Sequence, residues 1–204
     1  MGRYTGPKHK LARREGINIF GKTSQSLERR INVPPGVHGK RRARKLSEFG
    51  VQLREKQKLK RIYGLMERQF KKYILEAQRK KINTEDALVQ LLETRLDNVV
   101  YRLGFGKSRP MARQMVSHRH ILVNGRKVNI PSYRILEGDT IVLSEKFKIE
   151  KAEEDKNEPE VPAYLAKENM EGKLVRMPTR EDVSNPVDYQ LVIEGTGSTD
   201  YKHE

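Results

Sequence analysis

The charge of this 204-residue chain is distributed so unevenly that it limits both the fold and the partners. Residues 1–82 hold 24 Lys and Arg against 6 Asp and Glu, residues 83–149 hold 11 against 7, and residues 150–204 hold 7 against 14. The run 40–45 places five positive charges in six residues, which cannot pack as a core. With a net charge of +15, the chain is expected to meet a polyanion, most simply nucleic acid.

The residue types that are missing exclude several classes of protein. The chain has no cysteine, which excludes disulfides, thiol catalysis, and zinc or iron–sulfur sites built on cysteine. Its five histidines show no metal-ligand spacing, so we predict no metal and no cofactor. No stretch approaches about 18 consecutive apolar residues, and the N-terminus lacks the apolar run of a secretory signal. We therefore predict a cytoplasmic protein with no membrane partner.

The first half of the chain changes from irregular to helical near Ser47. Residues 1–46 show little periodicity and many Gly and Pro, which predicts an irregular segment that is either disordered or held by a partner. Ser47 is expected to cap a helix that Gly64 interrupts. A second helix is expected from Met66 to Lys80, where one apolar stripe predicts its buried face: Met66, Phe70, Ile74 and Ala77.

The stretch 83–143 carries the clearest local patterns. Asn83 is expected to cap the helix Thr84–Glu93, and a helix over 95–103 is expected to end at Gly104. Ser108 is expected to cap a further short helix. Asn124-Gly125 predicts a tight hairpin turn after the strand Ile121–Val123, and a third strand is expected at Thr140–Leu143.

The last quarter is acidic at first and then predicts short strands. Glu150–Glu160 is expected to be a linker, with strands at Lys173–Met177 and Gln190–Glu194. The fold class is therefore α+β, a helical N-terminal domain followed by a helix–helix–hairpin module on a small antiparallel sheet. We divide the chain into an irregular basic extension (1–46), a helical domain (47–91), the module (92–149), and an acidic linker with C-terminal strands (150–204).

Motifs for catalysis are not found. Gly106-Lys107-Ser108 resembles the end of a phosphate-binding loop, but Tyr101 stands where that motif requires glycine. The chain also has no Gly-x-Ser-x-Gly and no pair of carboxylates in an apolar setting. We therefore predict that the protein is not an enzyme and has no small-molecule substrate.

Several runs together resemble one known family. The strongest are 92–106, 112–118 and 123–126, which are joined by 3–7, 13–16, 34–39, 49–58, 61–64, 171–173 and 191–194. This pattern is similar to that of small-subunit ribosomal protein four, bacterial type, over nearly the whole chain. The central module alone is shared with RNA-modifying enzymes and tRNA synthetases, and the N-terminal runs narrow the resemblance to the ribosomal protein.

The resemblance implies a structural constituent of the small ribosomal subunit with several partners. Such a protein binds small-subunit ribosomal RNA directly at a junction in the 5′ domain and nucleates assembly. It lies near the mRNA entry path, and its contact with small-subunit ribosomal protein five bears on decoding fidelity. Many members also repress translation of their own messenger RNA.

The candidate RNA contacts are basic or polar side chains, because a folded RNA offers phosphates and 2′-hydroxyls to charged forks and small polar groups. Ser108 and the amides at that helix start are expected to receive a phosphate. By resemblance, Arg41, Arg42, Arg44 and Lys45 line the mRNA path. The other candidates are Arg3, Arg13, Arg14, Arg54, Lys58, Arg61, Arg95, Arg102, Lys107, Arg109, Arg113, Gln114, Ser117, His118, Asn124 and Arg126.

Three departures and two alternatives accompany this interpretation. His9 and Ala12 stand where some members have zinc-binding cysteines, Glu150–Glu160 is acidic where a basic helix is common, and Tyr164 replaces a common Trp. One alternative is an RNA-modifying enzyme such as a pseudouridine synthase, which needs a separate catalytic domain with an active-site Asp. The other is a DNA-binding regulator, which is usually a symmetric dimer.

Overall fold

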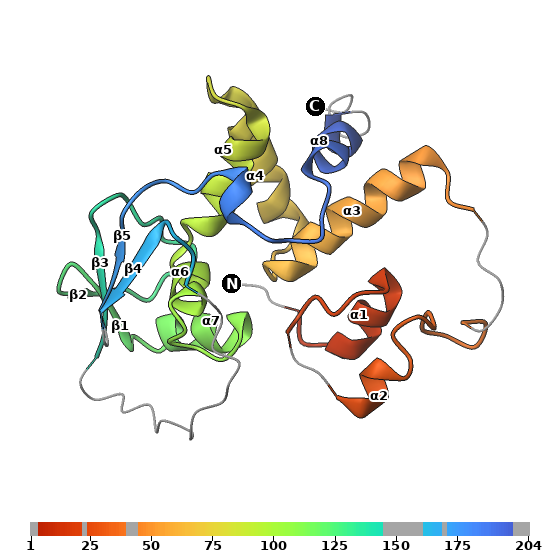
Figure 1. Cartoon of the computed structure of the whole chain (residues 1–204), viewed down its shortest axis with the longest axis horizontal. Coiled ribbons are helices and arrows are strands. Elements are labelled where there is room, and N and C mark those ends of the chain that lie inside the picture. The colour runs from red at the N-terminus through yellow and green to blue at the C-terminus, as the bar shows by residue number, and fades with distance from the viewer. Residues whose placement is uncertain (1–3, 22–23, 40–44, 145–160, 169–170, 198–204) are drawn as a thin grey trace. The chain divides into compact units, whose positions relative to one another are not determined.

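A computed structural model describes residues 4–21, 24–39, 45–144, 161–168 and 171–197 (Figure 1). They divide into two compact units, residues 1–79 with 185–204, and residues 80–184. The predicted contacts Arg3, Arg41, Arg42 and Arg44 and the predicted linker Glu150–Glu160 lie outside the described residues.

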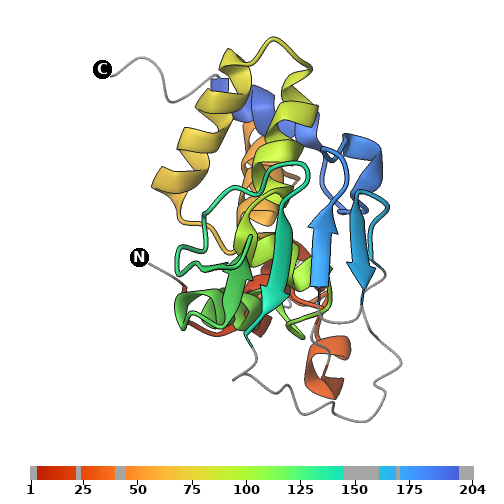
Figure 2. The same ribbon diagram turned by 90° about the vertical axis from the view of Figure 1, so that its left-hand side faces the viewer.

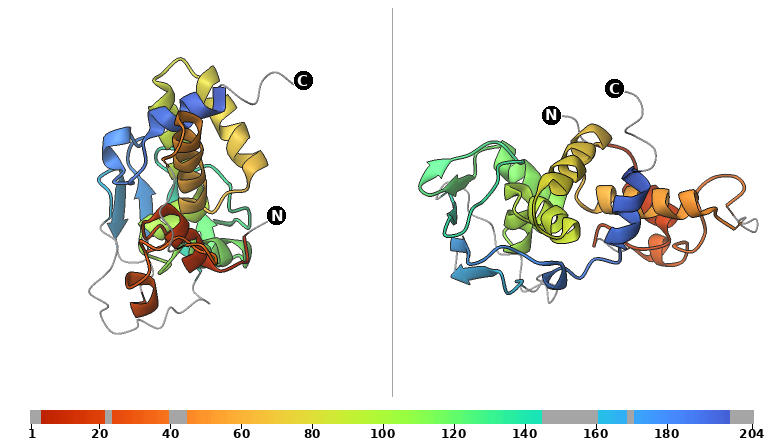
Figure 3. Two further views of the ribbon diagram at one scale, coloured as in Figure 1. Left: turned by 90° about the vertical axis from the view of Figure 1, so that its right-hand side faces the viewer. Right: turned by 90° about the horizontal axis from the view of Figure 1, so that it is seen from above.

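The first unit is helical in its described parts. It contains α1 (Lys8–Glu15), α2 (Gln25–Glu28), α3 (Glu48–Ile62), α4 (Glu67–Arg79) and, from the other end of the chain, α8 (Tyr189–Gly197). The Ser47 hydroxyl accepts from the Gly50 amide at 3.2 Å and so caps α3 as predicted. Helix α3 packs against α1 and α8, and Figure 3 shows α8 beside it.

The expectation of an irregular segment over 1–46 is wrong for α1 and α2. Ala12, Ile19 and Leu27 are buried there, and α1 packs against α3, so this part of the chain is folded into the unit. Helix α1 escapes a periodicity search because Ala12 is the one buried residue among many cations. Its boundaries are nevertheless marked in the sequence, by Pro7 at the start and by Gly16, whose φ of 70° ends the helix.

The second unit places helices against a sheet. It contains α5 (Thr84–Glu93), α6 (Leu96–Arg102), α7 (Arg109–Ser117) and η1 (Arg180–Asp182), a 3₁₀ turn. Its described strands form an antiparallel sheet in the order β2-β1-β3-β5-β4, which Figure 2 shows nearly face-on. The strands are β1 (Ile121–Val123), β2 (Arg126–Lys127), β3 (Thr140–Leu143), β4 (Leu165–Glu168) and β5 (Glu171–Leu174).

The core of this unit lies between α6, α7 and one face of the sheet. Leu96, Val99, Val100 and Leu103 are all fully buried, and Met115 and Val116 of α7 join them. Two glycines allow close approach. A Cβ at Gly172 would lie 2.3 Å from a methyl of Leu103, and one at Gly106 would lie 3.0 Å from the Ala112 nitrogen. The α+β class is thus confirmed.

Three sequence predictions differ from the structure. The expected strand Gln190–Glu194 is part of helix α8, and the expected strand Lys173–Met177 begins earlier and ends at Leu174. Met66 precedes α4 and is 47% exposed, so the buried stripe of that helix begins at Phe70. No helix in the described ranges is long and apolar enough to cross a membrane.

The turn η1 is held by one carboxylate. Asp182 accepts from the backbone nitrogen and the hydroxyl of Thr179, at 2.8 and 2.9 Å, and from Arg176. The Arg176 guanidinium, followed by the Thr179 donors, lowers the pKa of Asp182 to about 2. The stabilisation is therefore present above pH 4 and is lost as the pH falls toward 2.

We expect Asp182→Asn to lower the free energy of unfolding by about 1–2 kcal/mol at pH 7, since it removes the negative charge of the capping box that Arg176 and Thr179 stabilise. The difference between the two proteins should shrink as the pH falls from 4 to 2, because the wild-type carboxylate becomes protonated there. Urea unfolding at a series of pH values measures this. A difference that stays constant down to pH 2 would contradict the assignment.

Candidate nucleic-acid interface

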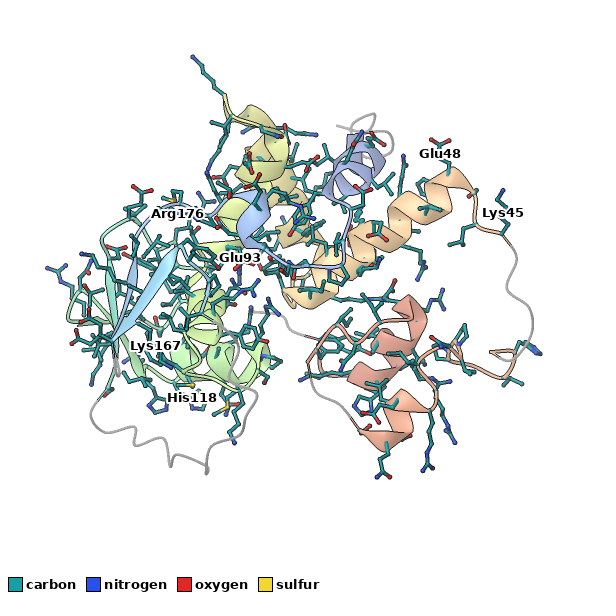
Figure 4. The ribbon with its side chains drawn as sticks, in the orientation of Figure 1. Lys45, Glu48, Glu93, His118, Lys167 and Arg176 are labelled. Atoms are coloured by element: carbon teal, nitrogen blue, oxygen red, sulfur yellow. The ribbon has the colours of Figure 1, made fainter. Side chains whose placement is uncertain are left out.

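Helix α7 separates an apolar face from a polar face. Ala112, Met115 and Val116 are buried against the core. The polar face carries Arg109, Arg113 and Ser117, which are four residues apart and so lie in one row. Gln114 and His118 are exposed beside this row, and Figure 4 marks His118 at the end of the helix. The Ser108 hydroxyl caps α7 by accepting from the Met111 amide at 3.4 Å.

The Arg102 side chain is held by a buried carboxylate at the junction of α5 and α6. Glu93 is fully buried, and its oxygens accept from Arg102 Nε at 3.1 Å and Nη2 at 2.9 Å. The Tyr164 hydroxyl donates to the same carboxylate at 2.7 Å. Burial, followed by the negative charge of Glu93, raises the pKa of Tyr164 above its usual value. Figure 4 shows Glu93 between these elements.

Asn98 continues this arrangement toward α7. Its amide nitrogen donates to Glu93 Oε2, and its amide oxygen accepts from Arg109 Nε at 2.9 Å. The Arg109 guanidinium also lies 4.5 Å from the centre of the Tyr101 ring, a cation–π contact. The orientation of Arg109 is therefore fixed from two sides.

Asp97 holds two further arginines, which differ in exposure. It accepts from Arg95 at 3.0 and 2.7 Å and from Arg113 at 3.1 Å. The Arg113 side chain is 14% exposed, whereas Arg95 is fully buried. We therefore assign Arg95 a structural role and leave it out of the interface, since its guanidinium lies inside the unit.

The β1–β2 hairpin adds exposed basic residues, and its turn is built on Asn124. This residue has a φ of 50°; its side chain donates to Asp139 at 2.7 Å and accepts from the Thr140 amide at 2.9 Å. Asn124 therefore acts first as a turn residue. Arg126 is exposed, and so are Lys107 before α7 and two cations that the sequence analysis did not select, Arg119 and Lys127.

In the first unit, all three predicted contacts on α3 are paired with acids. Arg54 and Arg61 meet Glu15, which is almost fully buried, and Lys58 meets Glu55. Burial raises the pKa of Glu15, and the neighbouring arginines oppose the shift. Arg13 donates to the backbone oxygens of Val33 and Pro34, at 2.9 and 3.2 Å, whereas Arg14 and Lys45 are exposed.

Within the described residues, no group of three or more His, Asp or Glu side chains is arranged to hold a metal ion. The site thus offers fixed guanidinium groups, exposed cations, and small polar groups, with no assembled acid–base or nucleophile set among the residues above. This is the chemistry of a surface that meets phosphate and hydroxyl groups rather than one that transforms a substrate.

Comparisons with known proteins agree with this geometry. Residues 3–93 match the family model described as the ribosomal protein S4/S9 N-terminal domain, and residues 94–141 match the S4 domain. Small ribosomal subunit protein uS4 from Thermus thermophilus is 50% identical over 206 residues, covering 95% of this chain and 98% of that protein. The protein of the same name from Shewanella violacea is 49% identical over 203 residues, with the same coverage. The chain belongs to the uS4 family.

Membership of the uS4 family makes the chain a non-enzymatic, RNA-binding protein of the small ribosomal subunit. It confirms the predicted family, the absence of an enzymatic function, and a location on the cytoplasmic ribosome. The boundary between the two family models, at residues 93 and 94, falls inside the second compact unit. Glu93 therefore matches the first family model, whereas Arg102, which its carboxylate holds, matches the second.

We expect Arg95→Met to lower the free energy of unfolding by about 3 kcal/mol, because it leaves the buried Asp97 with one cation fewer. Arg126→Ala, at an exposed hairpin position, should change it by less than about 0.5 kcal/mol. Urea unfolding of the two variants measures both values. Equal effects would show that Arg95 does not carry the structural role assigned to it.

Proposed function

We propose that this protein binds a junction in the 5′ domain of small-subunit ribosomal RNA through α7, the turn before it, and the β1–β2 hairpin. The observation that carries the proposal is a set of three held arginines: Arg102, Arg109 and Arg113 each donate to a buried acceptor. The same unit carries exposed cations before and after α7 and on the hairpin, at Lys107, Arg119, Arg126 and Lys127.

Fixed guanidinium groups suit a folded RNA better than flexible ones do. The planar fork of arginine bonds two phosphate oxygens at once. Because the major groove of an RNA helix excludes most side chains, a protein recognises such a junction largely by its shape and backbone. Cations held in place can match one arrangement of phosphates, whereas mobile cations match any polyanion.

The remaining predicted contacts are included in the proposal on different grounds: exposure, partial exposure, or the resemblance alone. Gln114, Ser117 and His118 are exposed on α7, and Ser108 lies at its start, where helix amides favour a phosphate. In the first unit we include Arg14 and Lys45, which are exposed, and Arg13, Arg54, Lys58 and Arg61, whose pairing leaves them partly exposed. Arg3 also belongs to the proposal, on the strength of the resemblance.

Direct binding predicts a specific and salt-dependent complex. We expect a 5′-domain transcript to be bound in the presence of excess tRNA and duplex DNA, with a footprint at one junction. Arg126→Ala should weaken binding and lower the slope of log affinity against log salt concentration by about one, the loss of one neutralised phosphate. Filter binding across a salt titration measures both quantities.

Lys81→Ala is the matched control for Arg126→Ala. Lys81 is exposed and precedes α5, at the end of that helix away from α6, and its loss should leave the slope unchanged. Binding abolished equally by any polyanion would contradict recognition of a junction. Preference for duplex DNA would favour a DNA-binding regulator, and turnover of uridine in RNA would favour a modifying enzyme.

The resemblance further supports early assembly of the subunit, a position at the mRNA entry path and contact with small-subunit ribosomal protein five, with a part in decoding fidelity. Alanine at Arg41, Arg42, Arg44 and Lys45 should slow unwinding of structured messages by reconstituted subunits. Unchanged unwinding would contradict the mRNA-path role. Cross-linking to protein five and misreading rates in the same subunits test the remaining proposals.

A further inference from the structure

One carboxylate in the proposed interface does not fit a surface built only to attract RNA. Glu93 is fully buried beside Arg102, and it receives four hydrogen bonds, from Asn98 Nδ2, Arg102 Nε and Nη2, and Tyr164 Oη. Asn98 and Arg102 both belong to α6, and Tyr164 is the residue before β4. A carboxylate that accepts from every side in this way acts as an ionised acceptor.

The negative charge of Glu93 opposes the attraction of a polyanion. It cancels one of the positive charges nearby, and a long-range field would be stronger without it. Stability alone does not require it either, because a buried ion pair is often replaceable by apolar side chains without loss. The remaining difference between Glu93 and such a replacement is geometry, since a carboxylate fixes the fork of Arg102 through two parallel hydrogen bonds.

Asn98 extends this geometric effect to a second arginine. An amide has one donor end and one acceptor end. Because Glu93 only accepts, it fixes the donor end of Asn98 toward itself and leaves the amide oxygen for Arg109 Nε, at 2.9 Å. One carboxylate therefore orients Arg102 directly and Arg109 through one amide.

We propose that Glu93 is a positioning residue that gives the interface its selectivity for one arrangement of phosphates, at the expense of general attraction to polyanions. The inference rests on the proposed function, because it needs Arg102 and Arg109 to meet RNA. It assigns Glu93 no contact with RNA of its own.

Glu93→Gln separates charge from geometry, because glutamine keeps the shape and removes the negative charge. If Glu93 acted through charge alone, the variant would bind all polyanions more tightly. Positioning predicts the opposite for the junction: its affinity should fall about tenfold, while affinity for a random duplex stays equal or rises. The measured quantity is the ratio of the two affinities at one salt concentration, with circular dichroism to confirm folding.

Two further variants make the result decisive. Glu93→Asp keeps the charge but withdraws the carboxylate by one methylene, so the ratio of junction to duplex affinity should again be lower than in the wild type. This variant also provides the test if the Gln variant does not fold. Tyr164→Phe removes one hydrogen bond to Glu93 and leaves both arginine contacts, so it controls for lost stability, and its ratio should stay within twofold of wild type.

Each outcome has one meaning. If the wild-type protein shows no preference for the junction, the proposed function fails, and the inference about Glu93 fails with it. If the wild type prefers the junction and both Glu93 variants keep the same ratio, the inference is overturned while the proposed function stands. An equal fall in Tyr164→Phe would also overturn it, because lost stability would then explain the effect.

Discussion

The pairing of scarce carboxylates with abundant cations governs this fold. A chain with a net charge of +15 must bring cations together without repelling itself apart. It does so by giving single acids two basic partners each. Glu15 serves Arg54 and Arg61, Glu67 serves Lys56 and Lys60, and Asp97 serves Arg95 and Arg113.

This sharing explains why the same interior supports both folding and recognition. A carboxylate with two arginine partners leaves a local excess of positive charge, and burial keeps it away from the screening effect of solvent. Arg95 and Arg113 show the two ends of this arrangement, since one lies inside and the other reaches the surface. The acid thus joins the core of the second unit to its proposed RNA surface.

The sequence predicted most of the second unit because its local patterns agree with its packing. Asn83 and Ser108 do cap their helices, the apolar spacing of α6 matches the core, and Asn124-Gly125 does form the turn between β1 and β2. The C-terminal helix α8 was misread as a strand because its Leu-Val-Ile run favours extended structure. Packing against α3 decides its conformation instead, and a Cβ at Gly195 would lie only 2.8 Å from Gln52.

Candidate site residues were harder to predict than the fold, because charge in a sequence does not reveal its partner. Arg95 and Arg126 are the same residue type, yet Arg95 pairs with Asp97 inside the unit and Arg126 is exposed. Arg102 and its acceptor Glu93 are nine positions apart, on different helices, so no short pattern links them. Arg119 and Lys127 were missed for the opposite reason, since exposure on a turn and a strand leaves no mark in local periodicity.

Because α8 returns to the first unit, the order in which the two units are synthesised differs from the order in which they can complete folding. Residues 80–184 are continuous, so the second unit has its whole sequence as soon as residue 184 has left the ribosome that makes it. The first unit contains α1 to α4, which precede the second unit in the chain, and α8, which follows the second unit and packs on α3 and α4. Helices α1 to α4 are therefore translated before the second unit but gain their last packing partner after it, once α8 has left the ribosome.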